Sequence, residues 1–199
     1  MKKQYAMITK LKVVDPESAI AKIRTSNWKQ NESIYLRDSE LLLVSFAESS
    51  QDLLAQVESN AMAKREDLLR EQLHSDWSRQ IVKYVTTAKD AAAPFENSAY
   101  LQLRYIEVPA YRYNEYSAWR ESTIFSHVRK QEPIDFFHAY HTVVSTQPGV
   151  MFLAGFSCSE NEYKQLFEND HYREIIRQAG SRYIVDGENG LYTHIYKRV

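Results

Sequence analysis

The chain repeats itself. The stretch SFAESSQDLLAQVESN (residues 45–60) aligns without a gap with GFSCSENEYKQLFEND (residues 155–170). In both stretches an apolar run ends, a serine follows (Ser49 or Ser159), and an acidic residue comes three positions later. Apolar residues then recur at helical spacing, and a serine in this position is a typical helix N-cap. Each stretch therefore predicts a strand followed by a helix, and two similar halves leave the chain few ways to fold.

The elements around the repeated stretches also recur in one order. Runs of β-branched and aromatic residues indicate strands, and apolar residues spaced three and four apart indicate helices. The first half predicts strand, helix, strand, strand, helix and strand at residues 5–14, 16–24, 33–37, 41–47, 50–73 and 80–86. The second half predicts the same order at residues 100–108, 115–130, 136–144, 150–157, 160–178 and 191–197.

Each half thus has the β-α-β-β-α-β order of a ferredoxin-like fold, an antiparallel sheet with both helices on one face. The other face of each sheet must also be hidden, and two sheets in one chain achieve this by packing face to face and closing into a barrel. The predicted fold class is α+β. We expect a first repeat at residues 1–88, a linker at 89–99 that contains Pro94, and a second repeat at 100–199.

Composition narrows the class of protein. The net charge of −1 and the pI near 6.6 imply no basic face, so nucleic acid is not an expected partner. The single cysteine, Cys158, excludes an intramolecular disulfide framework and favours a reducing compartment. Lys10 and Lys12 interrupt the only candidate signal-peptide core, and no run of about 18 apolar residues could span a membrane. We expect a cytoplasmic protein, either a monomer with an intramolecular barrel or a homodimer.

The strand FFHAYHTVV (residues 136–144) holds two histidines three positions apart. Side chains alternate faces along a strand, so His138 and His141 point to opposite sides and cannot chelate one metal ion. No His-Glu-x-x-His motif and no Cys/His cluster occurs elsewhere, so no metal site is predicted. The face with Phe137 and Ala139 is the smaller and more apolar one, and we expect it under the helices.

The opposite face, with His138, Tyr140 and Thr142, is then expected to point into the barrel. In the strand YLQLRYIEV (residues 100–108), Leu101 and Leu103 suit the helix side. Gln102 and Arg104 would accordingly line the cavity with the first three. A cation, an imidazole and phenols around an apolar chamber suit an anionic aromatic ligand such as a phenol or quinone. The alternative is structural: Arg104 as an ion-pairing residue and Tyr140 as a hydrogen-bonded core residue.

The helix YNEYSAWRESTIFSHVRKQ (residues 113–131) carries a stripe of Tyr116, Trp119, Thr123 and His127. The simplest interpretation is that the helix packs on its sheet through Tyr116, Trp119, Ile124 and Val128, with Arg120 and Glu121 in solvent. The other interpretation places Trp119 and His127 at the mouth of the cavity.

The second half, above all QPGVMFLAGFSCSENEYKQLFENDHYREII (residues 147–176), resembles the dimeric α/β-barrel superfamily, which includes antibiotic-biosynthesis-type monooxygenases and heme-degrading proteins. The first half departs more from that pattern, because its first helix is short and its second is long. Cofactor-independent monooxygenases of this kind often place a Trp, an Asn, an Arg and a Tyr about the substrate. Trp119, Asn114, Arg104 and Tyr140 are residues of these types, although they do not match position by position.

The resemblance implies three alternatives. The first is a cofactor-independent monooxygenase-like enzyme for a small aromatic or quinone-like compound, with Arg104 and Tyr140 anchoring oxygens and His138 exchanging protons. Gln102, Thr142, Trp119 and Asn114 would contact its substrate. The second is a heme-binding or heme-handling protein with His127 or His171 as axial ligand. The third is a non-catalytic barrel that binds a small molecule or a partner protein. No cofactor is predicted for the first alternative.

Overall fold

A computed structural model of the chain describes residues 4–26, 32–91, 97–147 and 149–199. These residues divide into two compact units. Unit 1 comprises Met1–Tyr84, Thr142–Thr146 and Tyr196–Val199, and unit 2 comprises Val85–His141 and Gln147–Ile195. The units interleave along the chain, so the continuous repeats 1–88 and 100–199 remain a prediction about domain limits.

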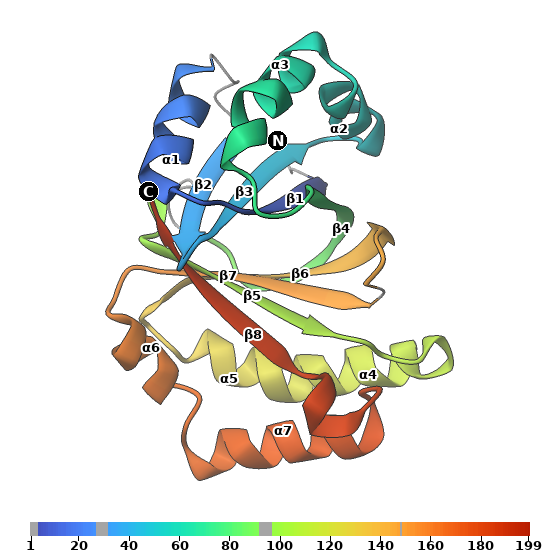
Figure 1. Ribbon diagram of the computed structural model, residues 1–199. Coiled ribbons are helices and arrows are strands. Elements are labelled where there is room, and N and C mark those ends of the chain that lie inside the picture. The colour runs from blue at the N-terminus through green and yellow to red at the C-terminus, as the bar shows by residue number, and fades with distance from the viewer. Residues whose placement is uncertain (1–3, 27–31, 92–96, 148) are drawn as a thin grey trace. The chain divides into compact units, whose positions relative to one another are not determined.

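The first half has the predicted order of elements (Figure 1). Asp15 caps the first helix by accepting from the backbone N–H groups of Glu17 and Ser18. The elements are β1 (Tyr5–Lys12), α1 (Pro16–Thr25), β2 (Glu32–Arg37), β3 (Glu40–Ala47), α2 (Ser50–Val57), α3 (Asn60–Leu69), the short 3₁₀ turn η1 (Arg70–Gln72) and β4 (Ser78–Lys89).

The second half follows the same order. Its first helix is continuous in direction but contains a π-helical turn, η4. The elements are β5 (Tyr100–Ile106), η3 (Ala110–Arg112), α4 (Tyr113–Arg120), η4 (Glu121–Phe125), α5 (Ser126–Arg129), β6 (Ile134–Val144), β7 (Val150–Phe156), α6 (Glu160–Gln165), α7 (Asp170–Arg182), η5 (Gly187–Gly190) and β8 (Tyr192–Arg198).

The long second helix predicted in each half is wrong, because each half has two shorter helices in its place. Ser49 and Ser159 cap the first of these, as predicted. Ser59 and Asn169 cap the second, and they occupy matching positions in the gap-free alignment of the two stretches. Each accepts from a backbone N–H three residues on, which satisfies a donor that a new helix would leave unpaired. The repeat therefore extends to the helix break itself.

The strands are antiparallel and follow the order β1-β3-β2-β8-β5-β7-β6-β4, a cyclic order in which β4 pairs again with β1, as in a closed barrel. Strands β4, β6 and β8 each have residues in both units. The α+β fold class and the ferredoxin-like pattern are thus confirmed. Among the described residues, no helix combines the length and apolarity needed to cross a membrane.

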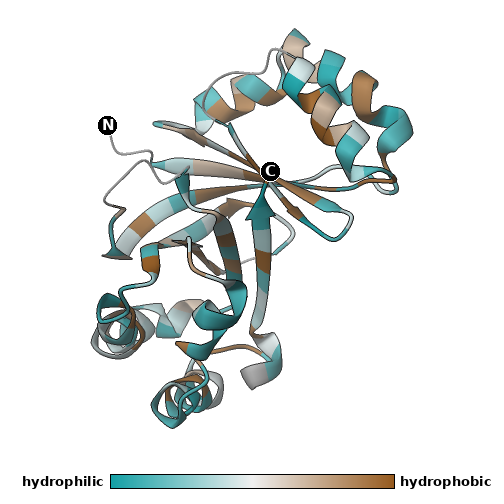
Figure 2. Ribbon diagram, turned by 90° about the vertical axis from the view of Figure 1, so that its left-hand side faces the viewer, coloured by the Kyte–Doolittle hydropathy of each residue, from teal (hydrophilic) through white to brown (hydrophobic). Residues whose placement is uncertain are grey.

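Each unit buries its own apolar core. In unit 1, helices α1 to α3 carry brown and teal residues in alternation (Figure 2), as amphipathic helices do. In unit 2, helices α4, α5 and α7 lie on the same side of the strands (Figure 1). The core on that side joins Phe137 and Ala139 of β6, Phe152 of β7 and residues of the three helices. We call this face of the unit 2 sheet the helix side; Phe137 and Ala139 were correctly predicted to lie on it.

Candidate functional site

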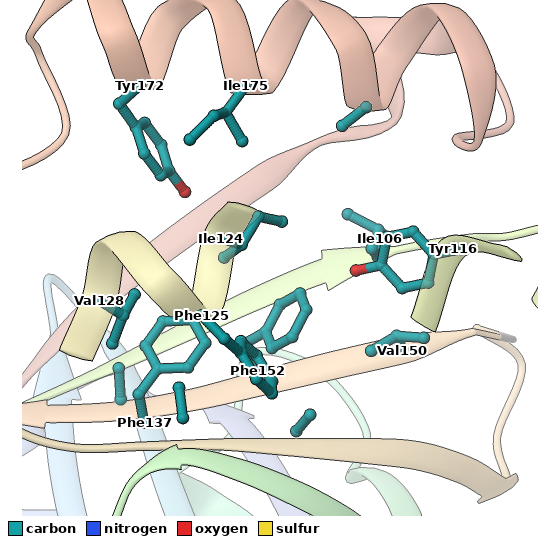
Figure 3. Close-up of a cluster of buried hydrophobic side chains, with 14 of the residues drawn as sticks. Ile106, Tyr116, Ile124, Phe125, Val128, Phe137, Val150, Phe152, Tyr172 and Ile175 are labelled. Atoms are coloured by element: carbon teal, nitrogen blue, oxygen red, sulfur yellow. The ribbon is translucent and has the colours of Figure 1, made fainter. Parts of the chain in front are cut away.

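Arg104 lies on the helix side of β5, beneath α7. Its Nη1 donates to the hydroxyl of Tyr172 at 2.7 Å, and its Nε donates to Oγ1 of Thr193 at 2.8 Å. Tyr172 descends from the first turn of α7, and its hydroxyl points toward the sheet (Figure 3). Because the Tyr172 oxygen accepts from a cation, its own proton stays available for donation to a third group. Within the described part of the chain, no carboxylate pairs with Arg104.

A small pocket adjoins Arg104 between the sheet and the helices. Apart from Arg104 and the phenol of Tyr116, its walls are apolar, and its free volume is about 10 Å³, which is room for one water molecule. Half-buried Ile176 and Leu191 form part of the wall. Figure 3 shows the surrounding side chains converging from α4, η4, α7 and the sheet. The lining residues are Arg104, Ile106, Tyr116, Ile124, Phe137, Phe152, Ile176, Ala179, Ile184 and Leu191.

The predicted cavity set is wrong in one respect: it joins residues from two faces of the sheet. Arg104 pairs with Phe152 and Gln102 with Ala154, and residues directly opposite in an antiparallel pair share a face. Gln102 and Arg104 therefore lie on the helix side, and Leu101 and Leu103 do not. His138 pairs with Leu153 and Tyr140 with Met151, which places both on the opposite face. The strand β5 is buried on both faces, so polarity alone did not reveal its orientation.

Gln102 is buried beside Ala154, and its Nε2 has no hydrogen-bond partner among the described residues. Thr142 lies two residues beyond Tyr140 on β6 and belongs to unit 1. The structure thus brings Gln102 and Arg104 to one side of the sheet and leaves His138 and Tyr140 on the other.

His138 is mostly buried, with 16% of its side chain exposed. Its Nε2 lies 3.5 Å from Oδ1 of Asp90, and its ring approaches those of Phe136 and Tyr140. Burial lowers the pKa of His138, and the charge of Asp90 offsets part of that effect. The imidazole is therefore held toward its neutral form on the face away from Arg104.

Trp119 and Asn114 differ in their surroundings. Trp119 is half-buried; its Nε1 donates to Oε1 of Gln178 on α7 at 3.4 Å, and its ring packs against those of Tyr116 and Tyr183. It braces α4 against α7 next to the pocket. Asn114 is exposed in the first turn of α4 and does not line the pocket.

Arg120 is buried, contrary to the prediction that it lies in solvent. It is 3% exposed, and its guanidinium lies 4.8 Å from the ring centroid of Phe125 and 5.5 Å from that of Tyr116. It follows Tyr116 by four positions and so shares its helix face, and the π-helical turn that begins at the next residue adds Phe125 to that face. Burial raises the pKa of Tyr116, and the positive charge of Arg120 acts against that rise.

The heme candidates His127 and His171 lie close together, with ring centroids 6.0 Å apart. His127 is buried, and its Nε2 is 3.0 Å from the carbonyl oxygen of Leu166, so this nitrogen donates to the turn between α6 and α7. Burial lowers the pKa of His127, as do the charges of His171 and Lys130. His171 is exposed on α7, and neither histidine lines the pocket.

The two buried histidines predict how stability depends on pH. His127 and His138 both have a folded pKa below the usual 6.5, so the unfolded chain binds protons more readily than the folded chain. The contribution of these two histidines to the free energy of unfolding should be fully present above about pH 7 and should be lost as the pH drops through 6.5. Urea unfolding at pH 7.5 and 5.5 measures the resulting fall in the free energy of unfolding.

A His138→Asn variant should show a smaller fall between these two pH values than the unchanged protein, because one of the two linked groups is gone. A His141→Asn variant is the control, since His141 is exposed. A fall of equal size in the His138 variant would contradict the assignment.

Sequence reasoning missed Tyr172, Tyr116 and Ile176 as residues of the site. Tyr172 follows the capping residue Asn169 by three positions, so an earlier recognition of that cap would have placed it in the first turn of α7. Among the described residues, no cluster of three or more His, Cys, Asp or Glu side chains is arranged to hold a metal ion.

Comparison with known proteins identifies the fold. No protein-family model matches the sequence, and no curated protein matches it. An anthrone oxidase-like protein superposes with a TM-score of 0.67 at 9% identity, over 100% of this chain and 92% of its own. A ferredoxin-fold protein from Listeria monocytogenes related to antibiotic biosynthesis monooxygenases has a TM-score of 0.60 at 8% identity, covering 100% and 96%. A heme-degrading enzyme from the same species has a TM-score of 0.58 at 9% identity, covering 98% and 99%. At these identities the likeness establishes the fold, which is the one expected from the resemblance.

Proposed function

We propose that the chain is a cofactor-independent monooxygenase-like enzyme that binds a small aromatic or quinone-like compound on the helix side of unit 2. The observation that carries the proposal is Arg104, a cation without an acidic partner in the described chain, held at the edge of an apolar pocket. Its guanidinium is positioned by Tyr172 and Thr193. An apolar pocket with a few convergent polar groups is the usual form of a small-molecule site.

The lining of the pocket favours a substrate that is itself acidic. Arg104 and Tyr116 are the only ionisable residues in the described lining, so the pocket supplies a positive charge but no carboxylate or imidazole to act as base. A guanidinium close to a bound phenol or enol stabilises its anion and lowers its pKa. Phenols, hydroquinones and anthrone-like compounds, which ionise readily, are the compounds that such a pocket can activate.

The proposed reaction uses this anion directly. The ionised substrate gives electrons to molecular oxygen, and an activated CH₂ group becomes a C=O group. One oxygen atom enters the product, the other leaves as water, and the two hydrogens lost from carbon balance that water. Arg104 would stabilise the oxyanion of the substrate, and the hydroxyl of Tyr172 would donate to the same oxygen. This assignment replaces Tyr140 and His138 in the predicted roles, because they lie on the other face.

A ring compound needs more room than the pocket holds. Ile176 on α7 and Leu191 before β8 are half-buried members of its wall, and their movement would open it between the helix and the sheet. Adjustment of this kind on ligand binding is common for enzyme sites covered by a helix or loop. A ligand held between α7 and the sheet would contact Ile176 of α7. Its binding should therefore slow hydrogen exchange of the α7 amides.

The test is oxygen consumption with a panel of hydroquinones and anthrone-type compounds, followed by mass spectrometry of the product formed under ¹⁸O₂. We expect one ¹⁸O atom per product molecule and one O₂ consumed per turnover. Binding without oxygen uptake would support the third alternative, a non-catalytic small-molecule-binding protein. Absence of binding to the whole panel would overturn the proposal.

The heme alternative is supported by the fold shared with a heme-degrading enzyme. The pocket beneath α7 does not fit that group, because no histidine lines it and His127 already donates to Leu166. Heme binding would therefore depend on His171 at the surface. A stoichiometric Soret band on titration with hemin, lost in a His171→Ala variant, would place this alternative first.

A further inference from the structure

We infer that Tyr116, with the buried charge of Arg120 behind it, forms a second anion-recognition point in the pocket, so that the ligand is an aromatic compound carrying a carboxylate as well as its phenolic oxygen. This inference rests on the proposed site of unit 2 and names the class of its substrate.

The first observation is the hydroxyl of Tyr116. The side chain is fully buried and lines the pocket, and its hydroxyl points inward, toward Ile106 (Figure 3). By strict hydrogen-bond geometry the oxygen has no partner among the described residues. The Arg120 side chain nevertheless lies close enough to act on this hydroxyl and to lower the pKa of Tyr116 against the rise caused by burial. A bond from the guanidinium would be accepted by the phenol oxygen, so the phenol proton stays available to a ligand. Buried hydroxyl groups are nearly always hydrogen-bonded, so an inward-pointing phenol of this kind is a donor suited to a ligand.

The second observation is the charge behind that phenol. The guanidinium of Arg120 lies 5.5 Å from the ring centroid of Tyr116, and its Nε and Nη1 are buried without a hydrogen-bond partner in the described chain. None of the ion pairs formed by described residues includes Arg120. A buried cation without a counter-charge is costly, and an anion bound next to it would offset that cost.

Unit 1 provides an internal comparison. Its buried arginine, Arg65, pairs with Glu32 at 2.6 Å, and 6% of the Glu32 side chain is exposed. Arg65 and Arg120 are the buried arginines of the described chain. The first unit therefore neutralises its buried guanidinium with its own carboxylate, whereas the second unit leaves Arg120 without one. We take the missing carboxylate to be supplied by the ligand.

The two cations stand at different parts of the same cluster. Arg104 bonds Tyr172, and Arg120 stacks on Tyr116; the charges of Arg120 and Tyr172 both act on the pKa of Tyr116. A ligand with two anionic oxygens matches two such positions better than a simple phenol does. Arg120 acts through the Tyr116 hydroxyl, so it is a positioning residue and Tyr116 is the residue in contact.

The test compares 4-hydroxybenzoate with its neutral analogue 4-(hydroxymethyl)phenol by isothermal titration calorimetry. We expect the full chain to prefer the carboxylate by about tenfold, the effect of a hydrogen bond to a charged group. Tyr116→Phe and Arg120→Met should each remove most of that preference while changing affinity for the neutral analogue less than about threefold. Arg120→Lys should retain part of it, and Arg173→Met, which changes an exposed arginine of α7, should retain all of it.

The apo proteins give a second readout. A purely structural Arg120 predicts a lower melting temperature in Arg120→Met, whereas a cation kept for a ligand predicts an unchanged or higher one. If Arg120→Met does not fold, the loss of the carboxylate preference in Tyr116→Phe is the result that tests the inference. Equal affinity of the unchanged protein for both compounds, or a preference untouched by these variants, would overturn the inference while leaving the proposed function in place. If neither compound binds, the inference is overturned, whereas the proposed function is decided by the separate panel of hydroquinones and anthrone-type compounds.

Discussion

Arg104→Ala should lower oxygen uptake with any active phenol or hydroquinone at least about 100-fold, the usual effect of removing one oxyanion-stabilising donor. The loss should appear in kcat as well as in kcat/KM, because the guanidinium acts on charge that develops during the reaction. Arg104 is half-buried and its bonds go to two hydroxyl groups, so the variant should still fold. Circular dichroism and the melting temperature check that expectation.

Three further variants test whether the charge of Arg104, its partner Tyr172 or the opposite face of the sheet is responsible for the activity. Arg104→Lys keeps the charge but not the two-pronged hydrogen bonding, so activity should be intermediate. Tyr172→Phe removes the proposed donor and the acceptor of Arg104, and activity should fall by less than in Arg104→Ala. His138→Ala should retain activity, because His138 lies on the opposite face of the sheet. Full turnover in Arg104→Ala, or loss confined to His138→Ala, would contradict the assignment of the helix side.

The order of the elements could be predicted because each carries its own local signal. β-branched and aromatic runs mark the strands, and serine caps mark helix starts at Ser49 and Ser159. Ser59 and Asn169 cap the second helices in the same way, but the apolar spacing continues across each break and predicts a single helix in each half. Capping chemistry is a better guide to a helix break than apolar periodicity, which persists when two helices pack on the same sheet.

The site was harder to predict because strand faces could not be read from polarity. In β5 the residues of both faces are buried, from Leu101 and Leu103 on one to Gln102 and Ile106 on the other. Alternation of polar and apolar residues identifies a face only when the other face meets water. Arg104 and Gln102 were therefore assigned with His138, and the cluster of Tyr116, Tyr172 and Arg104 emerged only in three dimensions. The register of β5 with β7 is what assigns Gln102 and Arg104 to the helix side.

Gly155 of β7 packs closely against Phe136 of β6, and Gly155→Ala should lower the free energy of unfolding by about 3 kcal/mol, at the upper end of overpacking costs. A Cβ on Gly155 would lie 2.0 Å from Cε1 of Phe136 and 2.5 Å from Oγ of Ser98. Phe136 lies opposite Gly155, directly after a one-residue register shift of β6 at Asp135. The carboxylate of Asp135 accepts hydrogen bonds from Ser98 and Ser157. The added methyl group would therefore displace Phe136 and Ser98 from β7, the strand that also supplies Phe152 to the pocket.

Urea unfolding of matched variants separates this clash from a general intolerance of alanine. Gly187→Ala is the control, because a Cβ there meets nothing closer than 3.7 Å and suffers only the left-handed backbone conformation at φ +60°, a cost of about 1 kcal/mol. Phe136→Leu should rescue part of the Gly155→Ala defect, so the two changes together should cost less than the sum of the single costs. Strict additivity would show that the phenyl ring is not the obstacle.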